Sequence, residues 1–296
     1  MKKILIIGGC GYIGSSLFPY LKQKKYSVDT VDSEMFGNVT NPKNIKMNYG
    51  KLSKRFLNNY GVVILLAGHS TVSMCESDVS GSLKNNLINF VDLLEKLSNQ
   101  KFIYASSFRV YGDTGKKSAS EKDVKGRLLK HYDITKKAID DIAALSKVNY
   151  FSLRMATMNG YAKNFRINQM INQLYMNGIN NKKIVIYNPK DRRSILGIND
   201  FSRSIKSIIE NEAERGTYNL ASYNSTIYEI GKTISDLLKI DLEINKQSLS
   251  NMNTVIDTHK FEKTFNFEFK ESTKSIVESL IKNKAHRSKL ISDKKI

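Results

Sequence analysis

The chain has 296 residues, and 41% of them are hydrophobic, which is enough to fill the core of one large domain or of a domain with a smaller lobe. Its two cysteines have no companions at metal-ligand spacing, which argues against a zinc site or a disulfide framework, and we expect no metal. The formal net charge of +19 comes from scattered lysines, so we expect no nucleic-acid partner. No apolar stretch is long enough to cross a bilayer, and we expect a cytoplasmic protein without a membrane partner.

Apolar runs of strand length alternate with segments of helical periodicity through the first half of the chain. Such alternation predicts an α/β fold, in which helices flank a parallel sheet. The predicted strands span residues 4–7, 27–31, 62–67, 102–105 and 150–153, and the predicted helices span residues 12–21, 85–97 and about 129–146.

After about Arg154 the strict alternation loosens, and we expect a smaller C-terminal lobe to begin there. Residues 216–220 are expected to return to the sheet, and two last helices are predicted over residues 227–238 and 273–282. The predicted division is a sheet domain over residues 1–154 with a return near 195–221, a lobe over residues 155–194 and 222–283, and a basic tail over residues 284–296.

A glycine-rich segment, Gly8-Gly9-Cys10-Gly11-Tyr12-Ile13-Gly14, follows the first predicted strand and opens a helix. Gly8 permits a tight turn, Gly11 lets backbone N–H groups approach a pyrophosphate, and Gly14 allows the helix to lie close to the strand. Asp32 ends the second strand, where a carboxylate accepts hydrogen bonds from the adenosine ribose and repels a 2′-phosphate. These features predict a doubly wound dinucleotide-binding domain of the Rossmann type that prefers NAD.

Tyr132 and Lys136 stand at i and i+4, and hence on one face of a predicted helix. A nearby cation favours the phenolate, so we expect Tyr132 to exchange protons nearer neutral pH than a free tyrosine does. Only this pair follows a strand that carries a serine, Ser107, at the carboxyl edge of the sheet, where ligands bind in open α/β folds. The same spacing occurs in Tyr20 with Lys24 and in Tyr228 with Lys232, which we interpret as solvated helix faces.

The order of these motifs resembles that of the NAD-dependent epimerase/dehydratase family of extended short-chain dehydrogenases. The resemblance covers nearly the whole chain and rests on the glycine segment, Asp32, Leu66-Ala67-Gly68, Asn86, Ser107, Val110-Tyr111-Gly112, Tyr132 with Lys136, Leu153-Arg154, Gly160, the segment from Arg193 to Asp200 and the segment from Gly216 to Leu220. It implies an enzyme that binds NAD in domain 1–154, takes a nucleotide-sugar substrate in the smaller lobe, and forms a homodimer through the helix that carries Tyr132.

The resemblance also implies residue roles that the chemistry supports. Tyr132 would exchange the proton of a sugar hydroxyl, Lys136 would hold the nicotinamide ribose and keep Tyr132 acidic, and Ser107 would bind the reacting oxygen. Asn86 is a supporting candidate. The expected cofactor contacts are Gly8, Gly11, Tyr12, Ile13, Gly14, Asp32, Ala67, Gly68 and Lys136, and the expected substrate contacts are Ser107, Phe108, Arg109, Thr157 and Arg193.

Several positions depart from the family pattern. Dehydratases carry an acidic residue just after the serine, whereas Phe108 and Arg109 stand here, which disfavours 4,6-dehydration. Thr157 replaces the usual asparagine, and residues 47–50 lack the expected acid after the third strand. Cys75 and His69 are interpreted as packing or surface residues and not as an epimerase acid and base.

We therefore expect hydride transfer at C4 of a nucleotide-linked sugar, by a 4-epimerase or by a 4-keto reductase or dehydrogenase. Two alternatives stay open at this stage. One is a non-catalytic protein of this fold that binds NAD or RNA, and the other is a dehydrogenase for small unphosphorylated alcohols.

Overall fold

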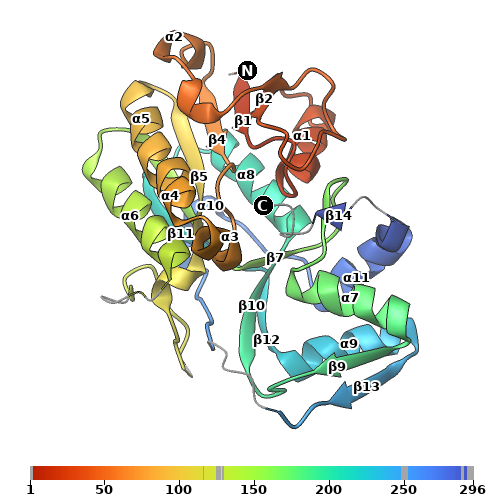
Figure 1. Ribbon diagram of the computed structural model, residues 1–296. Coiled ribbons are helices and arrows are strands. Elements are labelled where there is room, and N and C mark those ends of the chain that lie inside the picture. Colours follow the sequence, from red (N-terminus) through yellow and green to blue (C-terminus); the bar gives the residue numbers. More distant parts are fainter. Residues whose placement is uncertain are drawn as a thin grey trace.

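The computed structural model describes residues 3–115, 117–124, 128, 130–247, 253–287 and 290–291. In this part of the chain, a seven-stranded sheet runs in the order β11-β6-β5-β4-β1-β2-β3, and every neighbouring pair is parallel (Figure 1). Its strands are β1 (Ile4–Ile7), β2 (Val28–Asp32), β3 (Ile45–Lys46), β4 (Val62–Leu65), β5 (Lys101–Ser107), β6 (Asn149–Met155) and β11 (Gly216–Leu220). The predicted α/β fold with a parallel sheet is confirmed.

Helices cover both faces of this sheet because its strands are apolar on both sides. In β1, Ile4 and Ile6 enter one hydrophobic core, while Leu5 and Ile7 enter a second core on the other face. Figure 1 shows α1 and α8 on one side and α4, α5 and α6 on the other, so the sheet is doubly wound as predicted. The helices of this region are α1 (Gly14–Gln23), α2 (Lys54–Leu57), α3 (Val72–Ser77), α4 (Val79–Leu83), α5 (Asn89–Lys96), α6 (His131–Leu145), α8 (Ile198–Glu210) and the 3-10 turns η1 (Tyr49–Lys51) and η3 (Phe108–Tyr111).

The segment predicted as one helix over residues 85–97 begins instead with a π-helical turn, η2 (Lys84–Ile88), which continues into α5. The wide turn contains the buried Asn86. Its carboxamide accepts a hydrogen bond from the N–H of His69 at 2.8 Å and donates one to the carbonyl of His69 at 3.0 Å. The turn therefore coincides with the side chain that fixes the loop after β4, a common association of π-turns with functional sites.

Most of the remaining elements form smaller sheets and a group of helices at one end of the molecule, whereas α10 packs on β11 of the main sheet (Figure 1). The strands are β7 (Thr157–Asn159), β10 (Arg192–Gly197) and β12 (Tyr223–Thr226) in one sheet, β9 (Lys183–Ile186) with β13 (Asp241–Ile244) in a second, and β8 (Phe165–Arg166) with β14 (Leu290–Ile291) in a third. The helices are α7 (Met170–Asn181), α9 (Ile227–Leu238), α10 (His259–Phe265), α11 (Thr273–Lys282) and the short turn η4 (Ala285–Arg287). Residues 288–289 and 292–296 of the expected basic tail lie outside the described residues.

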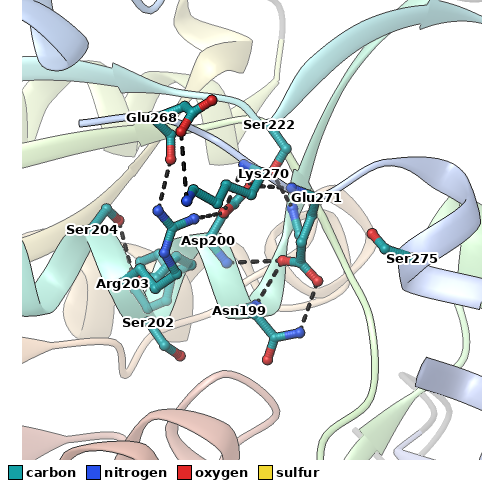
Figure 2. Close-up of polar contacts among 12 residues, drawn as sticks. Asn199, Asp200, Ser202, Arg203, Ser204, Ser222, Glu268, Lys270, Glu271 and Ser275 are labelled. Atoms are coloured by element: carbon teal, nitrogen blue, oxygen red, sulfur yellow. Dashed lines mark hydrogen bonds and ion pairs between the residues drawn. The ribbon is translucent and has the colours of Figure 1, made fainter. Parts of the chain in front are cut away.

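A buried carboxylate, Asp200, and a half-buried one, Glu271, join α8 to the segment that precedes α11, an arrangement that we call the carboxylate clasp (Figure 2). Glu271 accepts hydrogen bonds from the N–H groups of Asn199 and Asp200, each at 2.8 Å, in the first turn of α8. Asp200 in return accepts the N–H groups of Lys270 and Glu271 at 2.9 and 2.8 Å. A Cβ atom on Gly197 would lie 2.1 Å from a carboxylate oxygen of Glu271, so a larger residue there would displace this side chain.

Candidate active site

A cavity of about 630 Å³ opens at the carboxyl ends of β1, β2 and β4, which is a volume typical of ligand sites. All of the predicted cofactor contacts line it except Lys136, namely Gly8, Gly11, Tyr12, Ile13, Gly14, Asp32, Ala67 and Gly68. The structure thus gathers the glycine segment, the end of β2 and the loop after β4 around one space.

The glycine segment is shaped by close backbone contacts. Gly8 has a φ of +91°, and a Cβ atom there would lie 2.6 Å from the backbone nitrogen of Ala67. A Cβ atom on Gly14 would lie 2.2 Å from the carbonyl oxygen of Gly8, whereas one on Gly11 would meet only that oxygen, at 3.5 Å. Gly8 and Gly14 therefore allow α1 to pack closely against β1. Gly11 leaves the cavity open where a ligand approaches the backbone.

The start of α1 favours an anion. The side chain of Ile13 makes no capping hydrogen bond, and the N–H groups of Ser15 and Leu17 donate to the backbone carbonyls of Gly11 and Ile13. The helix dipole adds a partial positive charge at this end. The hydroxyl of Tyr12 points elsewhere, because it donates a hydrogen bond to the carbonyl of Gly160 at 2.8 Å and so joins the glycine segment to the strand region after β7.

Asp32 lies at the edge of the cavity, where its carboxylate accepts the N–H of Cys10 at 3.0 Å and the N–H of Glu34 at 2.7 Å. Burial raises the pKa of this carboxyl group, while these hydrogen bonds act in the opposite direction. A carboxylate accepts about four hydrogen bonds, so it retains acceptor capacity for ribose hydroxyls. The glycine cradle, the uncapped helix and this carboxylate together fit a dinucleotide.

The cavity also has walls that the sequence did not reveal. The additional lining residues include Met35, Phe36, Met47, Asn48, Tyr49, His69, Ser70, Asn85, Asn89 and Arg166. Among these, Arg166 is 8% exposed, and its guanidinium donates hydrogen bonds to Ser70 at 2.9 Å and to Asn168 at 3.2 Å. In the sequence, residues 47–50 stand out only because they lack the acidic residue of the family pattern. Arg166 is not recognisable as a cavity residue from the sequence, because its strand is only two residues long.

Ser107, Tyr132 and Lys136 come together beside this cavity, although none of them lines it. Ser107 ends β5, Tyr132 lies in the first turn of α6, and the Ser107 hydroxyl lies near enough to the phenol to affect its pKa. Lys136 follows one helical turn later, with its ammonium 5.8 Å from the centre of the Tyr132 ring and 2.7 Å from the carbonyl oxygen of Ala105. The arrangement places a phenol, a hydroxyl and an amine at the carboxyl edge of the sheet.

The expectation that Lys136 lowers the pKa of Tyr132 is not met. Burial raises the pKa of Tyr132, and the opposing effects come from the nearby Ser107 hydroxyl and from the positive charges of Arg166 and Arg109. Burial also lowers the pKa of Lys136 to about 8. The physical reason is desolvation, because a buried site disfavours the charged form of both groups, and the ammonium is directed at a backbone carbonyl.

The other predicted substrate contacts lie outside the cavity lining. Arg109 forms a two-point ion pair with Asp133, and Arg193 donates hydrogen bonds to the carboxylate of Asp191 and to the carbonyl of Arg192. Phe108 and Thr157 are half-buried. Both predicted arginines are thus engaged by protein carboxylates.

The residues interpreted as structural have structural partners. Cys75 is fully buried against the carbonyl of His69, and burial raises its pKa. Tyr228 is exposed on α9, where Lys232 pairs with Asp236. Within the described ranges, no cluster of three histidine, cysteine or acidic side chains forms a metal site, and no helix is long and apolar enough to cross a bilayer.

The profile of the NAD dependent epimerase/dehydratase family matches residues 4–221. The chain belongs to this family. It is therefore an NAD-dependent enzyme of the extended short-chain dehydrogenase type, as the motifs had suggested.

The proteins similar to this chain include epimerases and a dehydratase. UDP-glucose 4-epimerase uge1 of Schizosaccharomyces pombe is 32% identical over 128 residues, which span 37% of this chain and 36% of that enzyme. The UDP-glucose 4-epimerase of Thermotoga maritima, solved with UDP-glucose, shares the fold with a TM-score of 0.83 at 20% identity, over 95% of this chain and 99% of that one. The dTDP-glucose 4,6-dehydratase of Bacillus anthracis, solved with NAD, has a TM-score of 0.80 at 21% identity, over 96% and 98%. The fold is common to both reactions.

Proposed function

We propose that this enzyme transfers hydride at C4 of a nucleotide-linked sugar, as a 4-epimerase or as a 4-keto reductase or dehydrogenase. The observation that carries the proposal is that the Ser107 hydroxyl lies near enough to the Tyr132 phenol to affect its pKa, with Lys136 one turn further along α6 beside the dinucleotide cavity. Bound NAD supplies the acceptor and donor of hydride in this chemistry. The residues of the chain would bind the sugar and move its proton.

In this proposal Tyr132 takes the proton of the C4 hydroxyl when the carbon is oxidised and returns it when the carbon is reduced. The Ser107 hydroxyl would hold the reacting oxygen by donating to it, while its Oγ atom accepts the N–H of Arg109 at 3.2 Å. Its single hydrogen is therefore available to the phenol or to the sugar oxygen. Lys136 keeps a hydrogen-bond donor at the carboxyl edge of β5.

Dehydration is disfavoured by the residues after Ser107. Elimination of water needs an acid beside the sugar, and this turn presents the ring of Phe108 and the guanidinium of Arg109. The guanidinium is also bound to the carboxylate of Asp133, so neither side chain supplies a proton. This observation supports epimerisation or simple oxidation and reduction over a 4,6-dehydratase.

We also propose that residues 155–194 and 222–283 form the substrate lobe. Thr157 lies in β7 and Arg193 in the adjacent strand β10, and both would meet the sugar nucleotide after the lobe closes on it. Arg193 would exchange its bond to Asp191, 3.4 Å away, for the diphosphate oxygens, which is the planar recognition that arginine favours.

A homodimer through α6 belongs to the same proposal. The described surface of this region exposes Ile134 and Leu145 on α6 and Leu83 and Ile88 on the neighbouring α4 and η2. A second copy would cover these apolar side chains. Light scattering after size exclusion should show a dimer, and Ile134→Asp should give a monomer.

Screening nucleotide sugars for thermal stabilisation in the presence of NAD tests the main proposal, because a ligand that binds only the native state raises the melting temperature. The ligand found should then be turned over by the native enzyme, and Tyr132→Phe should lose activity about 100-fold or more while still binding NAD. NAD that survives purification indicates a 4-epimerase, and steady turnover of NADH with a 4-keto sugar indicates a reductase. Full activity in Tyr132→Phe contradicts the proposal.

A further inference from the structure

Arg109 and Asp133 connect the two segments that carry the proposed catalytic hydroxyls. Arg109 stands two residues after Ser107 in η3, and Asp133 directly follows Tyr132 in α6. The guanidinium Nε lies 2.7 Å from one carboxylate oxygen, and its second nitrogen lies 3.1 Å from the other. This two-point geometry is the strongest and most directional form of ion pair. The pair therefore spans the gap between the end of β5, which carries Ser107, and the first turn of α6, which carries Tyr132.

The pair is largely removed from water. The side chain of Asp133 is 5% exposed and that of Arg109 is 27% exposed. Burial raises the pKa of Asp133, and Arg109 opposes this increase by a hydrogen bond and by its charge. A buried carboxylate that loses its partner is strongly unfavourable, so the two side chains hold one relative position.

A second contact also orients the hydroxyl of Ser107. The backbone N–H of Arg109 donates to its Oγ atom at 3.2 Å. Because a serine hydroxyl has one hydrogen, this contact turns that hydrogen away from the η3 turn. The backbone of Arg109 thus orients Ser107, while its side chain holds the residue next to Tyr132.

We propose that Arg109 and Asp133 are positioning residues that set the distance between the Ser107 hydroxyl and the Tyr132 phenol for proton transfer. This inference rests on the proposed function. The helix itself has another tether, since Glu76 accepts the N–H of His131 at 3.1 Å at the start of α6. Loss of the Arg109 pair should therefore displace Tyr132 without unfolding α6.

The test compares Arg109→Gln, Arg109→Lys and Asp133→Asn with Lys137→Gln, which breaks an exposed ion pair with Asp141 on the same helix. Arg109→Gln should lower kcat about tenfold to 100-fold with little change in the KM of the sugar or in NAD affinity, because a small misplacement of reacting groups has this effect. Arg109→Lys keeps the charge but not the planar fork, so it should also lower kcat. Lys137→Gln should behave like the native enzyme.

The pH profile separates positioning from a merely structural role. Arg109 lowers the pKa of Tyr132 and Asp133 raises it, so Arg109→Gln should shift the rising limb of kcat to higher pH. Asp133→Asn should remove the opposing charge and shift the limb to lower pH. Unchanged kcat and pH profile in Arg109→Gln, even with a lower melting temperature, would overturn the inference.

A measurement without substrate keeps this inference distinct from the proposed function. Tyrosine labelled with ¹³C at Cζ reports each phenol by NMR, and Tyr132→Phe identifies the resonance of Tyr132 among the 15 tyrosines. If the native protein turns over no nucleotide sugar, the proposed function fails. The NMR titration of Tyr132 still tests the positioning role of Arg109. This role requires a higher pKa of Tyr132 in Arg109→Gln and an unchanged pKa in Lys137→Gln.

Discussion

The ammonium of Lys136 lies 2.7 Å from the carbonyl oxygen of Ala105, to which it donates a hydrogen bond. Ala105 belongs to the same strand that ends in Ser107, so this bond fixes α6 against β5 at the level of the proposed catalytic residues. Lys136 is 9% exposed, and its burial lowers its pKa to about 8. The backbone carbonyl thus holds an ammonium group whose charged form is disfavoured by burial.

Lys136→Met should stabilise the protein and inactivate it. The native state binds the proton of Lys136 less tightly than the unfolded chain does. Below pH 8 the buried charged amine therefore lowers the free energy of unfolding, and this free energy rises with pH between about 8 and 10.5. Methionine removes the penalty and should add about 1–3 kcal/mol at pH 7. Activity should fall about 100-fold or more. Thermal unfolding from pH 7 to pH 10 checks the sign, since the advantage of the variant should shrink at the alkaline end.

Arg166→Gln should weaken NAD binding about tenfold. Its guanidinium is buried in the cavity wall beside Ser70, where a positive charge favours a pyrophosphate. Titration calorimetry with NAD measures the effect. Arg166→Lys serves as the matched control, because it keeps the charge and should retain part of the affinity. Equal affinity in the native protein and Arg166→Gln would show that the group does not contact the cofactor.

Gly8→Ala should abolish NAD binding and destabilise the fold, whereas Gly115→Ala should have a small effect. Both glycines have positive φ angles, +91° and +60°, so both substitutions carry backbone strain of about 1–2 kcal/mol. At Gly8 the new Cβ atom would also meet backbone, 2.6 Å from the nitrogen of Ala67, whereas at Gly115 no atom of the described residues beyond its chain neighbours lies within 4 Å. Urea unfolding of the two variants separates strain from steric overlap, and similar losses in both would contradict the steric argument.

The carboxylate clasp should give a pH-dependent difference between the native protein and Glu271→Gln. Burial raises the pKa of Glu271, and the charge of Asp200 adds to the increase, whereas hydrogen bonds from backbone N–H groups oppose it. A raised carboxyl pKa gives stability that is present below the unfolded value and lost as pH rises through the folded value. The melting temperature of the native protein relative to Glu271→Gln should therefore fall between pH 4 and pH 7. A rise over this range would reverse the assigned direction.

The features that the sequence predicted are those with a local cause. The glycine segment, the buried strands and the place of Ser107 at the carboxyl edge of the sheet can be predicted from residue spacing. Each of them depends on residues that are close in the sequence. The roles assigned to the site residues stay predictions.

The features that the sequence did not predict depend on tertiary packing. Arg166 reaches the cavity only because β8 folds back over Ser70, and the pair of Arg109 with Asp133 forms only when α6 lies across the end of β5. The raised pKa of Tyr132 has the same origin, because spacing shows a nearby lysine but not the loss of water around the phenol. The π-turn at Asn86 likewise follows from a contact with His69, which is distant in the chain.

The carboxylate clasp also bears on where this chain can be cut. The family match ends at residue 221, yet the acceptor for the first N–H groups of α8 is Glu271. Helix α8 packs on α1, the helix that begins at the glycine segment. A fragment that stops at the family boundary would therefore expose uncapped amides and apolar surface next to the nucleotide site. We therefore expect that a fragment for expression and for cofactor-binding measurements must include Glu271.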